Sequence, residues 1–145
     1  MKRSDFPLWA RVQVRWGDMD AMGHVNNAMY FTYLETARIE LFASLGLEGP
    51  MTDGKIGMSL AHAACNFRRE VKYPNVLEIG TVVTKVGTSS FQLAHVFLFD
   101  GTDTLAADGN SVVVWADYAR GKSVPLPDAV RMKLMAFTAT PQTLA

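Results

Sequence analysis

Reactive side chains concentrate in one short stretch of the chain. Residues 15–40 read Arg-Trp-Gly-Asp-Met-Asp-Ala-Met-Gly-His-Val-Asn-Asn-Ala-Met-Tyr-Phe-Thr-Tyr-Leu-Glu-Thr-Ala-Arg-Ile-Glu. The first half has the composition of a turn, and a helix is expected to begin directly after it. A carboxylate such as Asp20, placed near the unpaired N–H groups of a helix start, can act as a nucleophile or base while those N–H groups stabilise an oxyanion. This combination is the one that acyl-transfer chemistry requires.

Both carboxylates of this stretch also have a simpler interpretation. Asp is common in turns because its side chain accepts hydrogen bonds from nearby backbone N–H groups, and spacing alone favours that role for Asp18 and Asp20. The catalytic interpretation needs a carboxylate near the helix N-terminus, where the helix dipole stabilises its charged form. Because the two residues are two positions apart in an extended segment, they point the same way at different depths. They are therefore not expected to be equivalent.

The neighbours of Asp20 suggest how the turn is built. Asn26 or Asn27 is expected to cap the helix, and the N–H groups left uncapped in the first turn are the candidate oxyanion donors. Gly23 allows a positive φ angle or a close approach of the backbone to a ligand. His24 is a candidate general base, although a lone histidine in a turn is more often a hydrogen-bonded surface residue.

The hydrophobic pattern predicts the elements that position this turn. Side chains alternate over Ala10–Trp16, which indicates a half-buried strand with Val12, Val14 and Trp16 on one face. From Ala28 the apolar period changes to three and four, which predicts a helix of about five turns that ends at Gly46. The apolar positions that define it are Tyr30, Leu34, Ala37, Leu41 and Leu45.

Four longer strands are expected after the helix, followed by a short terminal helix over Asp128–Phe137. Short turns separate the strands, so we expect a meander of antiparallel neighbours. The fold class is α+β, with one long central helix wrapped by an antiparallel five-stranded sheet. The four strands are predicted at Ile56–Glu70, Val76–Gly87, Ser90–Phe99 and Thr104–Tyr118.

Composition limits the classes of function. The 145 residues fit a single domain (1–145), and 14 basic residues balance 14 acidic ones, which argues against a nucleic-acid partner. The only cysteine, Cys65, is expected in the core and fits a reducing compartment. The sequence lacks a signal peptide and a membrane-spanning apolar run, so we expect a soluble cytoplasmic protein. Neither metal-ligand spacing nor a nucleotide-binding glycine pattern is present, so we expect no metal and no cofactor.

The remaining charged residues are expected to lie mostly in solvent. Glu35 and Arg38 are three positions apart on the helix and most simply form a surface or interface ion pair. The other cations fall at the ends of the expected strands, where one or two are available for the phosphates of a ligand. They are Arg68, Arg69, Lys72, Lys85, Arg120 and Lys122.

The strand–turn–helix pattern resembles the hotdog-fold acyl-CoA thioesterases of the 4-hydroxybenzoyl-CoA thioesterase type. The residues that carry the resemblance are Arg-Trp-Gly-Asp-Met-Asp-Ala-Met-Gly-His-Val-Asn-Asn-Ala-Met-Tyr and Leu-Glu-Thr-Ala-Arg. It continues through Cys-Asn-Phe-Arg-Arg-Glu-Val-Lys-Tyr-Pro-Asn-Val-Leu-Glu-Ile-Gly and Lys-Val-Gly-Thr-Ser-Ser-Phe, and so covers most of the chain.

This resemblance implies a homodimer or homotetramer with active sites between protomers and no metal requirement. It also implies that Asp20 is the catalytic carboxylate and that backbone N–H groups near Asn27 polarise the thioester carbonyl. Strand residues of the partner protomer would line the path of the acyl group and pantetheine. The positions implied there are Gly57, Met58, Ser89 and Ser90, which join Gly23, His24 and Asn26 as candidate substrate-binding residues.

The sequence therefore predicts an enzyme that hydrolyses an acyl-CoA or a similar acyl thioester. Asp20 is the expected nucleophile or general base, and Asn27 belongs to the oxyanion-binding turn. Two alternatives stay open at this stage. One is a hydratase or dehydratase of acyl thioesters that uses His24 as its base, and the other is a non-catalytic acyl-thioester-binding protein.

Overall fold

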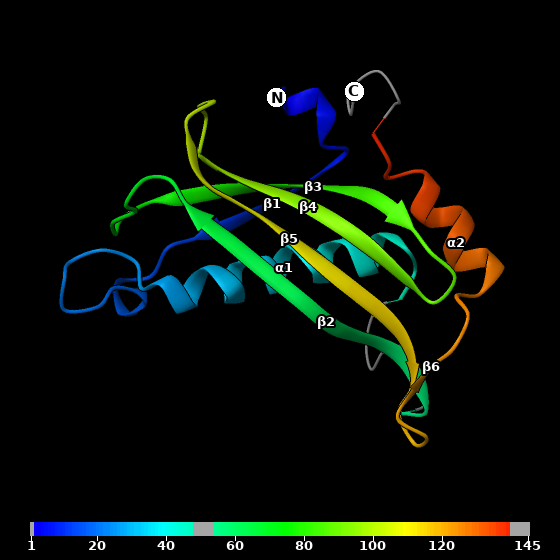
Figure 1. Cartoon of the computed structure of the whole chain (residues 1–145). Coiled ribbons are helices and arrows are strands. Elements are labelled where there is room, and N and C mark those ends of the chain that lie inside the picture. Colours follow the sequence, from blue (N-terminus) through cyan, green and yellow to red (C-terminus); the bar gives the residue numbers. More distant parts are fainter. Residues whose placement is uncertain (1, 48–53, 140–145) are drawn as a thin grey trace.

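A computed structural model describes residues 2–47 and 54–139 of the chain. One long helix, α1, lies across an antiparallel sheet, and a short helix, α2, follows the last strand (Figure 1). The elements in chain order are η1 (Arg3–Asp5), β1 (Leu8–Gln13), η2 (Trp16–Asp18), α1 (Asn27–Ser44), β2 (Ile56–Phe67), β3 (Val76–Val86), β4 (Ser90–Phe99), β5 (Leu105–Asp117), β6 (Lys122–Ser123) and α2 (Asp128–Met135).

The predicted α+β class and the curled antiparallel sheet are confirmed, but the predicted meander is wrong in one place. The strand order is β1-β3-β4-β5-β2, with the two-residue β6 paired to β5. Thus β3, β4 and β5 form a meander, whereas β2 pairs with β5 and lies at the edge. The eight residues 68–75 between β2 and β3 are long enough to cross the end of the sheet, so they are not a hairpin turn. Strand pairing is non-local, which is why turn length alone misassigned β2.

The first strand also differs from its prediction. It spans Leu8–Gln13, and Trp16 is 73% exposed. The chain leaves the strand because the Asp18 carboxylate accepts a hydrogen bond from the Arg15 N–H at 3.0 Å, which turns the backbone into η2. Val14 is buried as predicted. The apolar alternation therefore continued past the true end of the strand.

The long helix agrees with its prediction at both ends. The Asn26 side chain accepts a hydrogen bond from the Ala28 N–H at 2.9 Å and so caps the first turn. At the other end Gly46 has a φ angle of 75°, the left-handed conformation that ends many helices. On α2, the Lys133 ammonium donates to the Leu45 carbonyl at 3.1 Å, which satisfies one of the last carbonyls of α1.

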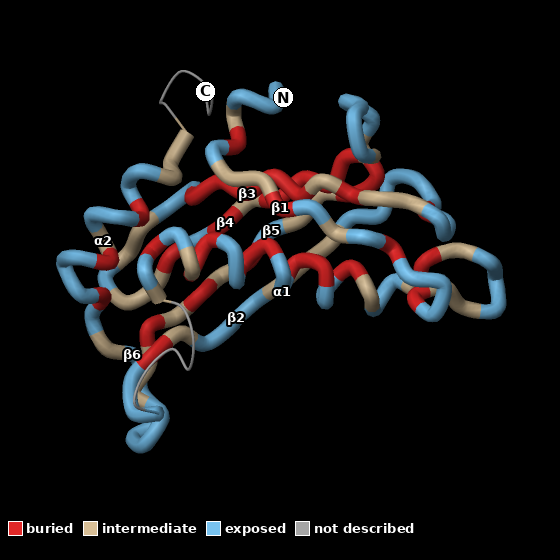
Figure 2. The backbone as a smooth tube through the Cα atoms, turned by 180° about the vertical axis from the view of Figure 1, so that it is seen from behind, coloured by how far each residue is buried: buried red, intermediate tan, exposed pale blue. Residues whose placement is uncertain are grey.

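Two core clusters lie between α1 and the sheet, and a smaller third one consists of Phe6, Val82 and Val96. Figure 2 shows that buried residues recur along α1 and the strands. The first cluster joins the early part of α1, including Tyr30 and Leu34, to β1, β3 and the buried Val71. The second joins the end of α1, including Leu41, and the C-cap residue Leu45 to β4, β5 and α2. Both clusters use the predicted apolar positions of α1, so the helix holds its first turn fixed relative to the sheet.

Arg38 does not form the predicted surface ion pair with Glu35. It follows Leu34 by four residues, lies on the same buried row of α1, and donates to Ser111 Oγ at 3.3 Å. Ser111 Oγ is 3.1 Å from His95 Nε2, and the other ring nitrogen is 3.0 Å from Thr81 Oγ1. Burial, and then the charge of Arg38, lower the pKa of His95 to about 3, so this histidine is neutral.

Candidate active site

The turn before α1 is held by a short ladder of backbone hydrogen bonds. Met19 and Val25 form an isolated antiparallel bridge, and the Asp20 N–H donates to the His24 carbonyl at 3.1 Å. Gly23 closes the turn by donating to the Asp20 carbonyl at 3.0 Å, with a φ angle of 81°. The predicted positive φ at Gly23 is confirmed. Residues 19–25 thus form a small, closed hairpin.

Asp18 anchors this hairpin to the helix. Its carboxylate is 1% exposed and accepts hydrogen bonds from the Tyr33 hydroxyl at 2.6 Å and from the Arg15 N–H at 3.0 Å. Burial alone would raise the pKa of Asp18, but these hydrogen bonds hold it below its usual value. Burial and then the bond to Asp18 raise the pKa of Tyr33. The Asp18 carbonyl also accepts from the Asn26 N–H at 3.0 Å, so Asp18 is structural.

Asp20 is placed differently, as predicted for a non-equivalent pair. One carboxylate oxygen accepts a hydrogen bond from the Met22 N–H at 2.9 Å, which is the turn-forming contact that Asp commonly makes. The other oxygen has no hydrogen-bond partner among residues 2–47 and 54–139. The side chain is half-buried. Asp20 therefore combines a fixed orientation with one oxygen available for chemistry.

The first turn of α1 leaves one backbone donor available. The Asn26 N–H is bound by the Asp18 carbonyl, the Ala28 N–H by the Asn26 side chain, and the Met29 N–H by the Asn26 carbonyl. Within the described part of the chain, the Asn27 N–H has no acceptor. A free N–H at a helix N-terminus lies at the positive end of the helix dipole and can bind an anionic oxygen.

Asp20 and Asn27 line one cavity of about 530 Å³. His24 and Asn26 also line it, and Gly23 belongs to the same turn but not to the cavity wall. The opposite wall comes from the chain after β2, which the Val25 N–H ties to the turn by a 2.7 Å bond to the Val71 carbonyl. The lining residues are Asp20, Met22, His24, Val25, Asn26, Asn27, Tyr30, Phe67, Arg68, Arg69 and Glu70.

The other predicted substrate residues lie elsewhere in the protomer. Gly57 and Met58 are at the opposite end of β2 from Phe67, roughly 30 Å along the strand. Ser89 and Ser90 lie near that same distant end, since Ser90 pairs with Val114 of β5, which also pairs with Ser59 of β2. A single protomer therefore does not bring them to the cavity.

Sequence reasoning did not identify the opposite wall as part of the site. Arg68 and Arg69 were expected as charges at strand ends, among six cations of which one or two were available for the phosphates of a ligand, and Phe67 and Glu70 were not singled out. Phe67 packs edge-on against Tyr30 of α1, with ring centroids 4.9 Å apart. No signal for it was available, because the expected strand ran to Glu70 and left only residues 71–75 for the connection to the next strand.

Comparison with known proteins gives the family. The sequence model of the thioesterase-like superfamily matches residues 14–134. The chain belongs to this superfamily. A Thermus thermophilus thioesterase, solved in complex with coenzyme A and Zn, is 31% identical and has a TM-score of 0.79, with 94% of this chain and 98% of that chain covered. The BH1999 gentisyl-coenzyme A thioesterase is 28% identical, with coverage of 88% and 99% and a TM-score of 0.77.

A curated relative gives the same assignment. The long-chain acyl-CoA thioesterase FadM of Escherichia coli is 28% identical over 132 residues, which covers 88% of this chain and 96% of FadM. Together these matches identify this thioesterase-like chain as a hydrolase of thioesters with the hotdog fold.

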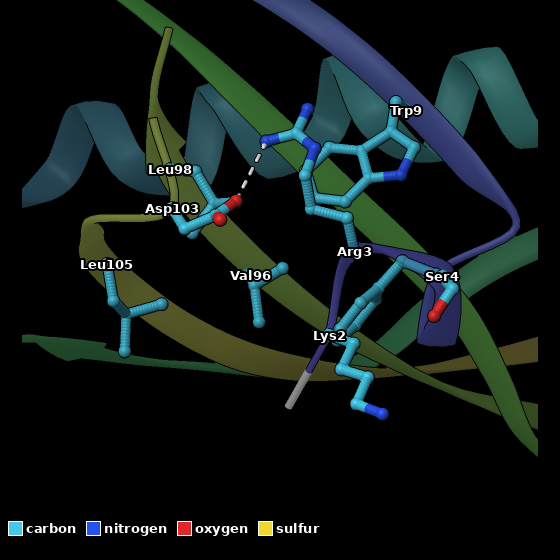
Figure 3. Close-up of a pocket in the computed structure, with 9 residues that line it drawn as sticks. Lys2, Arg3, Ser4, Trp9, Val96, Leu98, Asp103 and Leu105 are labelled. Atoms are coloured by element: carbon cyan, nitrogen blue, oxygen red, sulfur yellow. Dashed lines mark ion pairs between the residues drawn. The ribbon is translucent and has the colours of Figure 1, made fainter. Parts of the chain in front are cut away.

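A second cavity, of about 550 Å³, lies on the opposite face of the sheet in this thioesterase (Figure 3). Its floor is apolar, from Val96, Leu98 and Leu105. The Arg3 guanidinium lies 4.3 Å from the Trp9 ring and forms ion pairs with Glu78 and Asp103. This cavity shares no lining residue with the cavity at Asp20 and Asn27.

Three other features of the described residues do not form a functional site. No group of three or more His, Cys, Asp or Glu side chains within residues 2–47 and 54–139 is arranged to hold a metal ion. No helix in these ranges is long and apolar enough to cross a membrane. Cys65 is half-buried against the first core cluster, and burial raises its pKa to about 11, so its thiol is not activated.

Proposed function

We propose that the protein is an acyl-CoA thioesterase in which Asp20 is the nucleophile or general base and the Asn27 N–H is an oxyanion donor. One observation supports this proposal above the others: Asp20 and Asn27 line the same cavity, and among the described residues one Asp20 oxygen and the Asn27 N–H have no hydrogen-bond partner. The similarity to enzymes named for coenzyme A thioesters gives the substrate class.

The chemistry needs few groups. With the thioester carbonyl oxygen at the Asn27 N–H, negative charge that develops on that oxygen is stabilised by a donor already in position. In one route the Asp20 oxygen bonds to the carbonyl carbon, the C–S bond breaks, and water then hydrolyses the mixed anhydride. In the other, Asp20 takes a proton from an attacking water and the same C–S bond breaks. Either route releases a thiolate whose parent thiol is acidic enough, with a pKa near that of cysteine at about 8.5, to leave without a strong acid.

Isotope labelling tests for direct attack. In a single turnover in H2(18)O, direct attack followed by hydrolysis at the Asp20 carbonyl carbon of the anhydride leaves the label in the enzyme carboxylate, which activation of water never does. Label in the released acid alone is the result of activation of water and also of an anhydride hydrolysed at its acyl carbon, so label in Asp20 is the outcome that identifies direct attack. Mass spectrometry of the peptide that contains Asp20 reads the difference.

We also propose that a second copy of the chain completes the site by pairing along β2. This strand is twelve residues long and lies at an edge of the sheet, with Leu60 and Phe67 47% and 49% exposed. An exposed apolar edge of this length is a template for pairing with another chain. Antiparallel pairing about the middle of β2 would bring Gly57 and Met58 of the second copy next to Phe67. It would also bring Ser89 and Ser90 of the second copy toward that end of the strand.

The dimer proposal is tested by the state of association. Leu60→Lys places a charge on the edge strand and is expected to give a monomer in sedimentation equilibrium, with loss of activity. The control, Met132→Lys, carries the same type of change at a 74% exposed position of α2. A Leu60→Lys protein that is still a fully active dimer would exclude β2 as the interface.

The function itself is tested by release of free thiol from a panel of acyl-CoA substrates of different lengths and of aromatic acyl-CoAs. We expect steady-state hydrolysis of at least one class by the wild type and by Asp103→Asn, which removes an 85% exposed carboxylate that does not line the cavity at Asp20. Absence of thiol release across the panel, with tight binding retained, would instead support a binding protein. Reversible hydration of an enoyl-CoA, lost in His24→Ala, would support the hydratase alternative.

A further inference from the structure

Arg68 and Arg69 line the wall opposite Asp20 but differ in how their charges are used. Arg68 donates through Nε to Asp108 Oδ2 at 2.8 Å and through Nη2 to Oδ1 at 3.3 Å, a two-point ion pair. Asn66 also donates to Asp108 at 2.8 Å. The hydrogen bond from Arg68, opposed in part by burial, lowers the pKa of Asp108. The positive charge of Arg68 is therefore balanced within the protein.

Arg69 is held in place without being neutralised. Its N–H donates to the Ala106 carbonyl at 2.9 Å, and its Nη1 donates to the Leu105 carbonyl at 2.7 Å. No carboxylate within residues 2–47 and 54–139 lies within 4.0 Å of its guanidinium. A guanidinium has five N–H donors, so four stay available on a side chain whose orientation is already set. Such a group is suited to binding a phosphate.

The charges around the cavity restrict where an anion can bind. Asp20 and Glu70 are both carboxylates in the lining, and they repel a phosphate from their part of the cavity. Arg68 is neutralised by Asp108, which leaves Arg69 as the cation of this wall that can receive an anion. An acyl thioester of coenzyme A is uncharged along its pantetheine arm and carries its negative charge on the phosphates at the far end.

We propose that Arg69 is the receptor for a phosphate of the thioester's carrier group and so sets the direction in which the substrate lies. This proposal rests on the function proposed above. The pantetheine arm leaves the Asp20 turn toward the 68–70 wall, and the acyl group extends from the turn away from Arg69. The phosphate nearest the pantetheine is common to coenzyme A and to acyl-carrier proteins, so the chemistry recognised is a phosphate ester.

Substrates with and without phosphate test this assignment in the intact protein. For Arg69→Gln, we expect KM for an acyl-CoA to rise about tenfold to a hundredfold, as expected for the loss of one charge-assisted hydrogen bond, with kcat changed less than about twofold. The same acyl group on N-acetylcysteamine, which lacks the phosphates, is expected to be hydrolysed equally well by both proteins. Arg69→Lys, which keeps the charge, is expected to give an intermediate KM.

Arg11→Gln is the matched control, because it makes the same change in net charge. Arg11 lies on β1 and forms an exposed ion pair with Asp100. Its KM for both substrates is expected to stay at the wild-type value. An equal loss by Arg69→Gln on the acyl-CoA and on the N-acetylcysteamine thioester would overturn the proposal, since Arg69 would then act on the turn or on the chemistry. An unchanged KM for the acyl-CoA would overturn it as well.

Binding measured without turnover separates this proposal from the catalytic one. By calorimetry the wild type is expected to bind coenzyme A and 4′-phosphopantetheine more tightly than pantetheine, and Arg69→Gln is expected to lose that difference. If coenzyme A binds more tightly than pantetheine but 4′-phosphopantetheine does not, the nucleotide phosphates are the anion recognised. If the wild type hydrolyses no thioester but shows this pattern, the proposed function fails and the phosphate site stands. If pantetheine binds as tightly as coenzyme A, the phosphate site fails.

Discussion

The buried bond between Tyr33 and Asp18 gives a sharp test of how the turn is anchored. Tyr33→Phe removes the hydroxyl that donates to Asp18 at 2.6 Å and leaves the ring in place. In the variant, the Asp18 carboxylate loses this hydrogen bond but keeps those from the Arg15 N–H and the Arg15 side chain. The change therefore isolates one hydrogen bond to a charged, 1% exposed group.

The expected loss of stability depends on pH. A hydrogen bond to a charged group contributes about 1.5–3 kcal/mol, which corresponds to a decrease in Tm of roughly 3–12 °C for a chain of this size. The pKa of Asp18 is lower in the folded state than its unfolded value of about 3.9, because burial, which raises it, is outweighed by the hydrogen bonds from Tyr33 and Arg15 together with the charge of Arg15. The stabilisation is therefore complete above pH 4 and is lost as the pH falls through the folded-state pKa.

Urea denaturation at pH 7 and at pH 3 measures both the loss of stability and its dependence on pH. We expect a difference of about 2 kcal/mol between wild type and Tyr33→Phe at pH 7 and a smaller one at pH 3. Tyr118→Phe is the control, since Tyr118 is 46% exposed and its hydroxyl donates at 2.6 Å to the neutral Met58 carbonyl. Equal stability of Tyr33→Phe and wild type at pH 7, or a loss that does not change with pH, would refute the anchoring role of this pair.

Two further predictions concern the sheet. Gly80→Ala should destabilise the protein by about 1–3 kcal/mol in urea denaturation, because a Cβ there would lie 2.8 Å from the Trp9 ring; an unchanged midpoint would show that Trp9 moves freely. His95→Gln should remove a pH dependence of the free energy of unfolding. The pKa of His95 is about 3 in the folded state and about 6.5 in the unfolded state, so below pH 6 protonation of the unfolded state lowers the free energy of unfolding of the wild type by about 1.4 kcal/mol per pH unit. The gap in unfolding free energy between the two proteins should narrow by that amount from pH 6 to pH 5, and a constant gap would contradict the buried neutral state.

Local sequence signals predicted the helix and the turn because both are determined by residues close in the chain. The period of apolar residues gave the buried face of α1, and the capping role of Asn26 and the positive φ of Gly46 follow from residue type. Strand order was not accessible in the same way. The edge position of β2 depends on its pairing with β5, whose residues follow it by roughly fifty positions.

The candidate site was predicted on one wall only. Asp20 and Asn27 lie in a continuous stretch whose chemistry is visible in the sequence, whereas Arg69 reaches the cavity through the path of the 68–75 crossing. The predicted surface position of Arg38 was wrong for a related reason. Its charge indicated a solvent-exposed side chain, whereas its position on the helix places it on the buried row. Residue type predicted chemistry well, and predicted location only where the local pattern agreed with the tertiary packing.

The turnover number of Asp20→Asn tests the central claim most directly. This substitution keeps the shape of the side chain and an oxygen that can accept from the Met22 N–H, but it removes the nucleophilic or basic carboxylate. On the best acyl-CoA of the panel we expect kcat to fall by about a hundredfold or more, with KM within threefold of the wild type. A variant that folds normally and keeps kcat within twofold of the wild type would contradict the account.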